Sequence, residues 1–325
     1  MKRGIRMMNA QMVKEEISFK SDVSLKGTLL IPDQGKETYP AMVFLPGSGK
    51  LNRDGSTPKG KFKFDLYKDL AELCTSLGFV TFRYDKRGVG ESEGDFHSAG
   101  LSDALNDAEA ALDMLAAHPK VEPSKLIIIG HSEGCMVGTA LNTRRPASGL
   151  VLLSGGGETL KEALDHQRQL LYKEMREKKG IQGFIIKKLN TLDKAEKQAQ
   201  GTYKKMVESD KDVMKTLGFI KMPAKYFREH FALNIEEALT KVACPVLAIN
   251  GTKDFQANPE KLKRIEQFVQ GECEIHVVEN MDHGLKEQLT PMSPSTYKKD
   301  YLKTIGKPIH PEAVKHLTSW LQRYL

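Results

Sequence analysis

The stretch Lys125–Leu141, KLIIIGHSEGCMVGTAL, decides how the rest of this chain is interpreted. Its apolar run Leu126–Ile129 predicts a strand that is buried on both faces. The run ends at residues 130–134, GHSEG, and the small residues that follow, without a proline, predict the start of a helix. A strand, a G-x-S-x-G motif and a helix in this order are typical of a nucleophile elbow, a tight turn that presents a serine hydroxyl at the end of a strand.

The elbow interpretation selects one serine of the chain. Gly130 and Gly134 suit the turn because side chains beside so tight a bend would clash, and the helix behind the serine offers backbone N–H groups to a developing oxyanion. A second match, GESEG at residues 90–94, follows a glycine-rich loop, has no strand next to it and leads into polar residues. We interpret that copy as a polar loop. Ser132 is therefore the candidate nucleophile, and Ser92 is not.

Strand-like and helical patterns alternate on both sides of the elbow, which predicts an α/β fold with a mostly parallel central sheet and helices on both faces. Residues 12–32 alternate apolar and polar positions, as antiparallel strands with one solvated face do. Buried strands are expected at residues 39–45, 79–84, 149–153, 242–250 and 274–278, and helices at 64–77, 101–115, 262–269 and 313–324. The segment that holds Pro291, Pro294 and Pro308 is expected to be a loop.

The alternation stops over residues 158–240, which are rich in Lys, Glu and Gln and show no convincing strand. Apolar residues recur there at helical spacing, as at Leu160, Leu164 and Leu171, so we predict a helical insertion. The insertion leaves the sheet at the C-terminal end of a strand, where α/β active sites lie, and a lid is the expected role; a solvated decoration is the alternative. The expected domains are a core of residues 1–157 and 241–325 and a helical lid of residues 158–240.

Composition is that of an ordinary globular protein. The 325 residues are 40% hydrophobic and 28% charged, and the lysines behind the net charge of +7 are spread out, so no nucleic-acid partner is expected. The N-terminus lacks the apolar region of a secretory signal, and no run of 18 apolar residues predicts a membrane span. Four scattered cysteines without metal-ligand spacing favour free thiols in the cytoplasm and no metal site.

A serine hydroxyl is a weak nucleophile at neutral pH and needs a base to take its proton and a carboxylate to orient that base. For an elbow serine the partners follow in the order Ser, Asp or Glu, His, each in a loop at the end of a strand. Asp254 and His283 each come directly after an apolar strand and follow Ser132 in this order. We therefore predict a triad of Ser132, Asp254 and His283.

Four other residues compete for these roles. Asp282 adjoins His283 but is expected to point elsewhere from the same loop. His276 falls inside a predicted strand, and His131 is too close to Ser132 in sequence to turn back onto it. Cys135, one turn into the helix, is expected to pack against the sheet. None of the four displaces the predicted triad.

An oxyanion hole at an elbow uses the N–H of the residue after the serine and a second N–H from the loop after an earlier strand. Glu133 supplies the first donor. The turn at residues 46–49, PGSG, follows the expected strand 39–45 and supplies the second, with Ser48 N–H as the leading candidate and Gly49 as the alternative. Losing one such donor costs about 3 kcal/mol of transition-state stabilisation.

Five motifs extend the pattern along nearly the whole chain: LPGSG (45–49), RYDKRGVGESEG (83–94), GHSEG (130–134), NGTKD (250–254) and MDHGL (281–285). Together they resemble the α/β-hydrolase superfamily, and GSGKLNRDG (47–55) further resembles bacterial esterases of the dienelactone-hydrolase and serine-aminopeptidase-like branch. The resemblance implies carboxylesterase-type hydrolysis of a small-molecule ester by the predicted triad, without a cofactor. PGSG stands where many members have HGGG or HG, which leaves the choice between Ser48 and Gly49 open.

Fold does not determine the substrate. Esters of small to medium acyl chains are the expected substrates, cleaved through an acyl-enzyme intermediate. A peptidase acting on short peptides, an acyl-CoA thioesterase and a ligand-binding protein on a hydrolase core are the alternatives. Sustained turnover of a simple ester would separate an enzyme from a binding protein. A homo-oligomer is compatible with the sequence.

Overall fold

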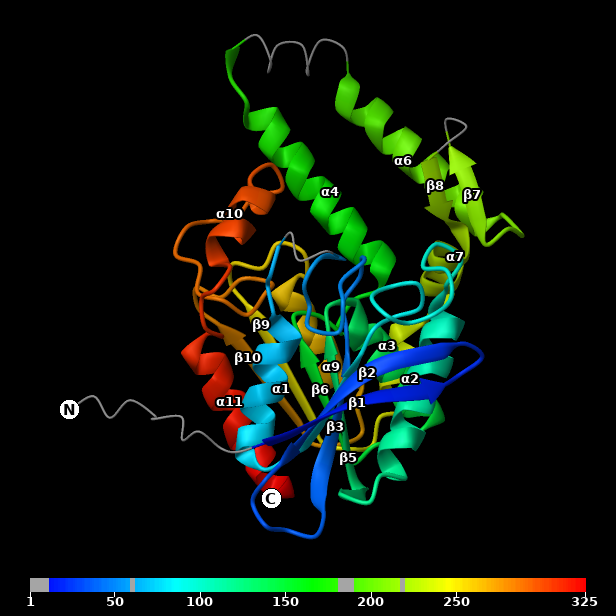
Figure 1. Ribbon diagram of the computed structural model, residues 1–325. Coiled ribbons are helices and arrows are strands. Elements are labelled where there is room, and N and C mark those ends of the chain that lie inside the picture. Colours follow the sequence, from blue (N-terminus) through cyan, green and yellow to red (C-terminus); the bar gives the residue numbers. More distant parts are fainter. Residues whose placement is uncertain (1–11, 59–61, 181–189, 217–219) are drawn as a thin grey trace, which may run out of the picture.

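The computed structural model describes residues 12–58, 62–180, 190–216 and 220–325. Within them, eight strands form one sheet in the order β1-β2-β4-β3-β5-β6-β9-β10 (Figure 1). The strands are β1 Met12–Lys20, β2 Ser24–Pro32, β3 Tyr39–Leu45, β4 Val80–Tyr84, β5 Val121–His131, β6 Gly149–Leu153, β9 Val246–Gly251 and β10 Cys273–Val278. β2 pairs antiparallel with β1 and β4, and the pairs from β4 to β10 are parallel. The predicted α/β class is confirmed.

Helices cover both faces of the sheet (Figure 1). α1 (Leu66–Leu77) and α11 (Pro311–Leu321) pack on one face. On the other lie α2 (Leu101–Ala116), α3 (Glu133–Arg144), α8 (Ile235–Leu239) and α9 (Leu262–Phe268). No helix in the described ranges is both long and apolar enough to cross a membrane.

The central strand β5 shows why the sequence requires two covered faces. Ile127 and Ile129 belong to the core beneath α1 and α11, whereas Leu126 and Ile128 belong to the core beneath α2 and α3. Successive side chains of a strand point to opposite faces, so a continuous apolar run buries all of its members only between two helical layers. Each buried side chain of this size contributes about 1.5–3 kcal/mol relative to an exposed one.

Between β6 and β9 the chain leaves the sheet. It forms α4 (Leu160–Glu177), α6 (Thr191–Val207), a hairpin of β7 (Val213–Thr216) and β8 (Ile220–Pro223), and then α7 (Ala224–Ala232) and α8. α4, α6 and the hairpin extend beyond one end of the sheet (Figure 1). The expectation of no strand in this segment is wrong at the hairpin, because strands of four residues are too short to show a reliable alternation.

A second difference lies near the C-terminus. Between Pro294 and Pro308, where a loop is expected, the chain forms α10 (Tyr297–Thr304). The prolines bound this short helix without entering it, which is compatible with helical backbone between them. α10 lies at the same end of the sheet as α4 (Figure 1).

Candidate active site

Ser132 occupies the turn between β5 and α3 with φ 55° and ψ −120°, an unusual backbone conformation for a residue with a side chain. Its N–H donates to Leu153 O at 2.9 Å, which ties the turn to β6. A Cβ on Gly130 would lie 2.3 Å from Gly134 O, and a Cβ on Gly134 would lie 2.0 Å from Leu45 O. Neither glycine position has room for a side chain, so the serine is held in a tight, strained turn at the end of the strand.

Asp254 and His283 meet beside this turn. Asp254 follows β9 and His283 follows β10, and these strands are neighbours in the sheet. His283 Nδ1 lies 2.8 Å from Asp254 Oδ2. The other carboxylate oxygen, Oδ1, accepts N–H groups of Gln256 at 2.8 Å and Ala257 at 3.0 Å. The carboxylate is therefore fixed by its own turn, and it orients the ring so that Nε2 is left for a reacting group.

The electrostatics of the pair favour a basic imidazole. Burial of the His283 ring acts to lower its pKa, but the charge and the hydrogen bond of Asp254 outweigh burial, and the pKa is raised above 6.5. Asp282, the competing carboxylate, uses its Oδ1 to accept Lys286 N–H at 2.9 Å, inside its own turn. Asp254 is thus the carboxylate that contacts the ring nitrogen.

Ser132 and His283 both line a cavity of about 460 Å³. The hydroxyl of Ser132 makes no hydrogen bond with any described residue; catalytic hydrogen bonds are often loose in a site without substrate. The remaining wall is largely aromatic and aliphatic and includes Phe62, Phe64, Tyr67, Tyr297, Tyr301 and Leu302. The last three belong to α10, a wall that the sequence analysis missed because it expected a loop there.

A second cavity of about 340 Å³ lies on the other side of the turn after β3. Ser48 lines both cavities, and Glu133 lines the second. Part of its apolar wall comes from the segment between β6 and β9, through Leu160, Leu164, Pro223, Tyr226 and Phe227, and the rest comes from core residues such as Tyr84, Phe96 and Val137. Of the described residues 158–240, none lines the cavity beside Ser132 and five line this one.

A chain of hydrogen bonds connects the turn after β3 to the loop that carries His283. Gly47 N–H donates to Tyr67 Oη at 2.7 Å, and Tyr67 Oη lies 3.0 Å from His131 Nδ1. His131 Nε2 lies 2.9 Å from His283 O, a carbonyl that can only accept, so Nε2 carries the proton and Nδ1 accepts the tyrosine proton. Burial and the charge of His283 lower the pKa of His131 to about 3, so this ring stays neutral.

His131 therefore belongs to the site, although its position next to Ser132 in the sequence does not indicate this role. It does not reach back to the serine; it contacts the backbone of the loop that holds His283. Tyr67 was also missed, because a tyrosine at a helical core position gives no sequence signal of a polar contact. The two residues link the candidate oxyanion turn to the candidate base.

Glu133, whose backbone N–H is the other candidate oxyanion donor, has a buried carboxylate that lies between the His230 ring and the Lys86 ammonium group. Oε1 lies 3.1 Å from His230 Nε2 of α7, and Oε2 lies 3.9 Å from Lys86 Nζ. Burial alone would raise the pKa of Glu133, but Lys86 and His230 lower it below its usual value. Lys86 also donates to Gly47 O at 2.7 Å. This network joins α7, the elbow and the turn after β3.

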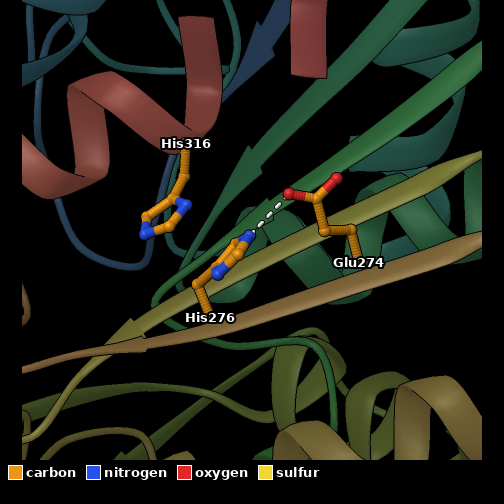
Figure 2. Close-up of side chains that lie close together, drawn as sticks. All are labelled: Glu274, His276 and His316. Carbon is orange, nitrogen blue, oxygen red and sulfur yellow. Dashed lines mark hydrogen bonds and ion pairs between the residues drawn. The ribbon is translucent and has the colours of Figure 1, made fainter. Parts of the chain in front are cut away.

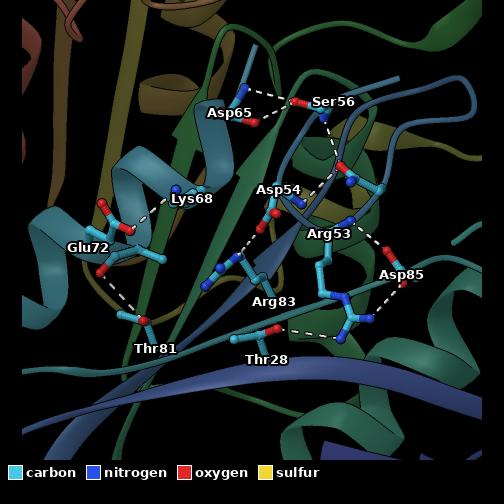
Figure 3. Close-up of polar contacts among 12 residues, drawn as sticks. Thr28, Arg53, Asp54, Ser56, Asp65, Lys68, Glu72, Thr81, Arg83 and Asp85 are labelled. Atoms are coloured by element: carbon cyan, nitrogen blue, oxygen red, sulfur yellow. Dashed lines mark hydrogen bonds and ion pairs between the residues drawn. The ribbon is translucent and has the colours of Figure 1, made fainter. Parts of the chain in front are cut away.

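The loop at residues 50–57 is anchored to the end of β4 (Figure 3). Arg53 N–H donates to Asp85 Oδ1 at 2.6 Å, and its guanidinium lies 3.2 Å from Asp85 Oδ2. Asp54 Oδ1 accepts from Arg83 Nε at 2.8 Å. Arg53, Asp85 and Arg83 have little exposed side chain, and paired charges in such surroundings hold a loop firmly. The RDG sequence thus fixes the far end of the loop that begins with Ser48.

Comparisons with known proteins identify the family of this chain. The family described as "Serine aminopeptidase, S33" matches residues 63–288, which include Ser132, Asp254 and His283. Esterase EstD of Thermotoga maritima is 28% identical over 235 residues, 71% of this chain and 50% of that esterase. The chain thus spans half the length of EstD, and smaller shares of the other curated relatives that it matches.

Solved structures share the fold. Est1E from Butyrivibrio proteoclasticus with bound ferulic acid is 18% identical, with a TM-score of 0.59 over 90% of this chain and 100% of that one. The alpha/beta hydrolase GrgF from Penicillium sp. sh18 is 13% identical, with a TM-score of 0.57 over 97% of this chain and 99% of that one. At these identities the likeness concerns the fold alone, and the predicted α/β-hydrolase fold is confirmed.

We expect Asp254→Asn to lower the pKa of His283, because the amide removes both the negative charge and the acceptor that stabilise the protonated ring. Asp282→Asn is the matched control and should lower this pKa less, since Asp282 contributes less to the raised value. NMR of the ring Cε1–H across a pH series measures both effects. A larger fall for Asp282→Asn would show that Asp282 is the dominant partner.

Proposed function

This chain belongs to the serine aminopeptidase, S33, family of α/β-hydrolases, and we propose that it is a serine hydrolase. The proposed substrates are carboxylic esters of small to medium acyl chains, which are cleaved through an acyl-enzyme intermediate. The observation that carries the proposal is the buried Asp254–His283 pair, 2.8 Å between Oδ2 and Nδ1, on the wall of the cavity that Ser132 lines from a strained turn. A serine, a histidine and a carboxylate in these relations supply the three roles of a hydrolytic triad.

In the proposed reaction, Ser132 Oγ attacks the ester carbonyl carbon while His283 Nε2 takes the hydroxyl proton. Asp254 holds the ring through Nδ1 and stabilises the imidazolium that forms. Collapse of the tetrahedral intermediate breaks the bond to the alcohol oxygen, which leaves with the proton from His283. Water then attacks the acyl-enzyme by the same steps and releases the acid. Only the neutral imidazole can take the serine proton, so kcat/KM should rise with pH as His283 loses its proton. Because the pKa of His283 is raised, this rise should occur at a higher pH than for an ordinary histidine.

The N–H groups of Ser48 and Glu133 are the proposed oxyanion donors, with Gly49 as the alternative to Ser48. The preceding N–H, that of Gly47, is already donated to Tyr67 and is not available. Glu133 is the first residue of α3, where an N–H has no partner within the helix. Lys86 and Tyr67 hold the two ends of Gly47, so the turn is positioned before substrate arrives.

Ester substrates are favoured over peptides by the walls of the two cavities. Phe62, Phe64 and Leu302 surround the cavity beside Ser132, and Leu160 and Phe227 line the second. A cavity of this volume with mostly apolar walls and few polar groups suits a small organic ligand. The relative EstD is itself called an esterase. Peptidase, thioesterase and binding-protein activities remain as outcomes that the experiments below distinguish.

The domain division into a core of residues 1–157 and 241–325 and a lid of residues 158–240 remains a proposal. We assign to the lid the apolar wall of the second cavity and, with it, contact with the acyl chain. The position of this cavity against Ser48 and Glu133, the proposed oxyanion donors, supports the assignment. The cavity beside Ser132, closed by α10, is then left for the alcohol portion.

Ser132→Ala should reduce ester turnover to background and abolish labelling by a fluorophosphonate probe, because it removes the attacking oxygen. Ser92→Ala is the matched control within the second G-x-S-x-G copy. Ser92 Oγ donates to Asp85 O at 2.7 Å and accepts Lys26 N–H at 3.0 Å, so its loss should cost about 1–3 kcal/mol of stability but little turnover below the unfolding temperature. Loss of activity in folded Ser92→Ala with activity kept in Ser132→Ala would overturn the assignment.

Tyr67→Phe should lower kcat by about 10- to 100-fold with little change in KM. The variant lacks the hydroxyl that bonds Gly47 N–H and His131, so the proposed oxyanion turn and the His283 loop are no longer linked. Tyr39→Phe is the control: its hydroxyl also accepts backbone N–H groups, from Gln34 and Lys36, but Tyr39 lies at the opposite end of β3 from the turn at residues 46–49. Steady-state kinetics with a p-nitrophenyl ester measure both. Equal losses in the two variants would reduce the role of Tyr67 to general stability.

Phe227→Ala should shift the acyl-chain optimum to longer esters by a few carbons, since it enlarges the cavity that we assign to the acyl chain and each buried methylene is worth about 0.8 kcal/mol. Leu302→Ala enlarges the other cavity and should leave the optimum in place while improving esters of bulkier alcohols. A series of p-nitrophenyl and alkyl esters gives kcat/KM for each variant. The reverse pattern would assign the acyl chain to the α10 side and remove this role from the lid.

A further inference from the structure

A cluster of potential metal ligands lies away from the cavities, where the edge strand β10 packs beneath α11 (Figure 2). The donor atoms of Glu274, His276 and His316 all lie within 4.8 Å of one another. His276 Nε2 is 2.6 Å from Glu274 Oε1, and the rings of His276 and His316 are stacked with centroids 3.5 Å apart. Among the residues that the structure describes, no other group of three histidine, cysteine or carboxylate side chains approaches so closely.

The fold itself brings these three residues together. Glu274 and His276 are two positions apart on β10 and therefore point to the same face of the sheet. α11 covers that face and places His316 opposite them. On the adjacent strand β9 the paired positions are Leu247 and Ile249, both fully buried in the core. The side chains thus change from apolar to ligand-type where the sheet reaches its edge and becomes partly exposed.

We propose that Glu274, His276 and His316 bind a divalent transition-metal ion of the Zn²⁺ type. Two imidazoles and one carboxylate are the ligands that such an ion prefers, whereas Mg²⁺ and Ca²⁺ prefer oxygen alone. Two ligands at about 2.1 Å from a tetrahedral ion lie about 3.4 Å apart. Donors that are now up to 4.8 Å apart would approach by at most about 1.4 Å, and Glu274 Oε1 and His276 Nε2, now 2.6 Å apart, would separate by about 0.8 Å. The side chains are 24–36% exposed and have room for this rotation.

Two neighbouring features support the site. Glu312, one turn before His316 on α11, places Oε2 3.9 Å from His316 Nε2 and also pairs with Lys315 at 3.0 Å, so a further carboxylate lies beside the cluster. Three protein ligands leave a fourth position for water, which the partial exposure of the cluster allows.

The site has a structural consequence for the strand that carries it. β10 is at the edge of the sheet and pairs within it only with β9. A bound ion would join β10 to α11 by coordination in addition to packing. β10 leads directly into the loop that carries Met281 and His283. Coordination of the ion would therefore restrain the strand that precedes the proposed base.

The test is titration of the EDTA-treated full chain with ZnCl₂. Calorimetry should show one equivalent of Zn²⁺ bound, and saturating Zn²⁺ should raise the unfolding temperature by about 3 °C or more. MgCl₂ at the same concentration should do neither. His316→Ala should abolish the one-equivalent binding, and Glu274→Gln should weaken it about tenfold or more. Circular dichroism verifies that each variant is folded, so a loss of binding can be separated from a loss of structure.

His118→Ala is the matched control. His118 Nε2 lies 3.4 Å from Glu15 Oε2, a histidine–carboxylate pair of the same kind without a third donor, and its removal should leave the Zn²⁺ equivalent unchanged. In a Cu²⁺ complex, electron paramagnetic resonance should show two coordinated nitrogens in the parent chain. Unchanged Zn²⁺ binding in His316→Ala, equal loss in His118→Ala, or no stoichiometric binding by the parent chain would each overturn the proposal. None of these readouts depends on ester hydrolysis.

Discussion

The close approach of α3 to the end of β3 is the constraint on which the rest of the site depends. Gly134 brings the first turn of α3 so near to Leu45 that a single methyl group would collide with the carbonyl oxygen, 2.0 Å away. That approach forces Ser132 into its positive-φ conformation and sets the turn after β3 directly beside it. A side chain at Gly134 would separate Ser132 from the turn after β3 and would also distort the turn that carries the serine, because one packing contact sets both.

Buried polar groups then connect the parts that this packing brings together. Tyr67 and His131 join the turn after β3 to the His283 loop, and Lys86, Glu133 and His230 join the same turn to α7. Groups buried in this way are costly when unpaired, so each of them restricts its neighbours to one arrangement. The loop after β3 is held from three sides, by a tyrosine, by a lysine and, further along, by Arg53 on Asp85.

Much of this architecture could be predicted from the sequence, because it depends on the spacing of apolar residues and on the order of strands and motifs along the chain. The isoleucine run of β5 requires two covered faces, and the contact of Asp254 with His283 follows once β9 and β10 are neighbours. The features that escaped prediction depend on contacts between distant segments. Tyr67 looks like any other core position of a helix, and α10 is concealed among prolines. The division of the apolar space into two cavities depends on side-chain positions that no periodicity encodes.

The buried Glu133–His230 contact restricts how the segment between β6 and β9 can move. If α7 swung outward, a carboxylate that now lies between His230 and Lys86 would lose one of its two polar neighbours in surroundings with little water. α7 therefore acts as the fixed base of this segment. If the proposed lid opens to admit a ligand, this contact places the motion further out, in α4, α6 and the hairpin, with α7 and α8 on the hinge side. Such an opening would change access to the second cavity without moving the turn after β3, to which Lys86 is bonded.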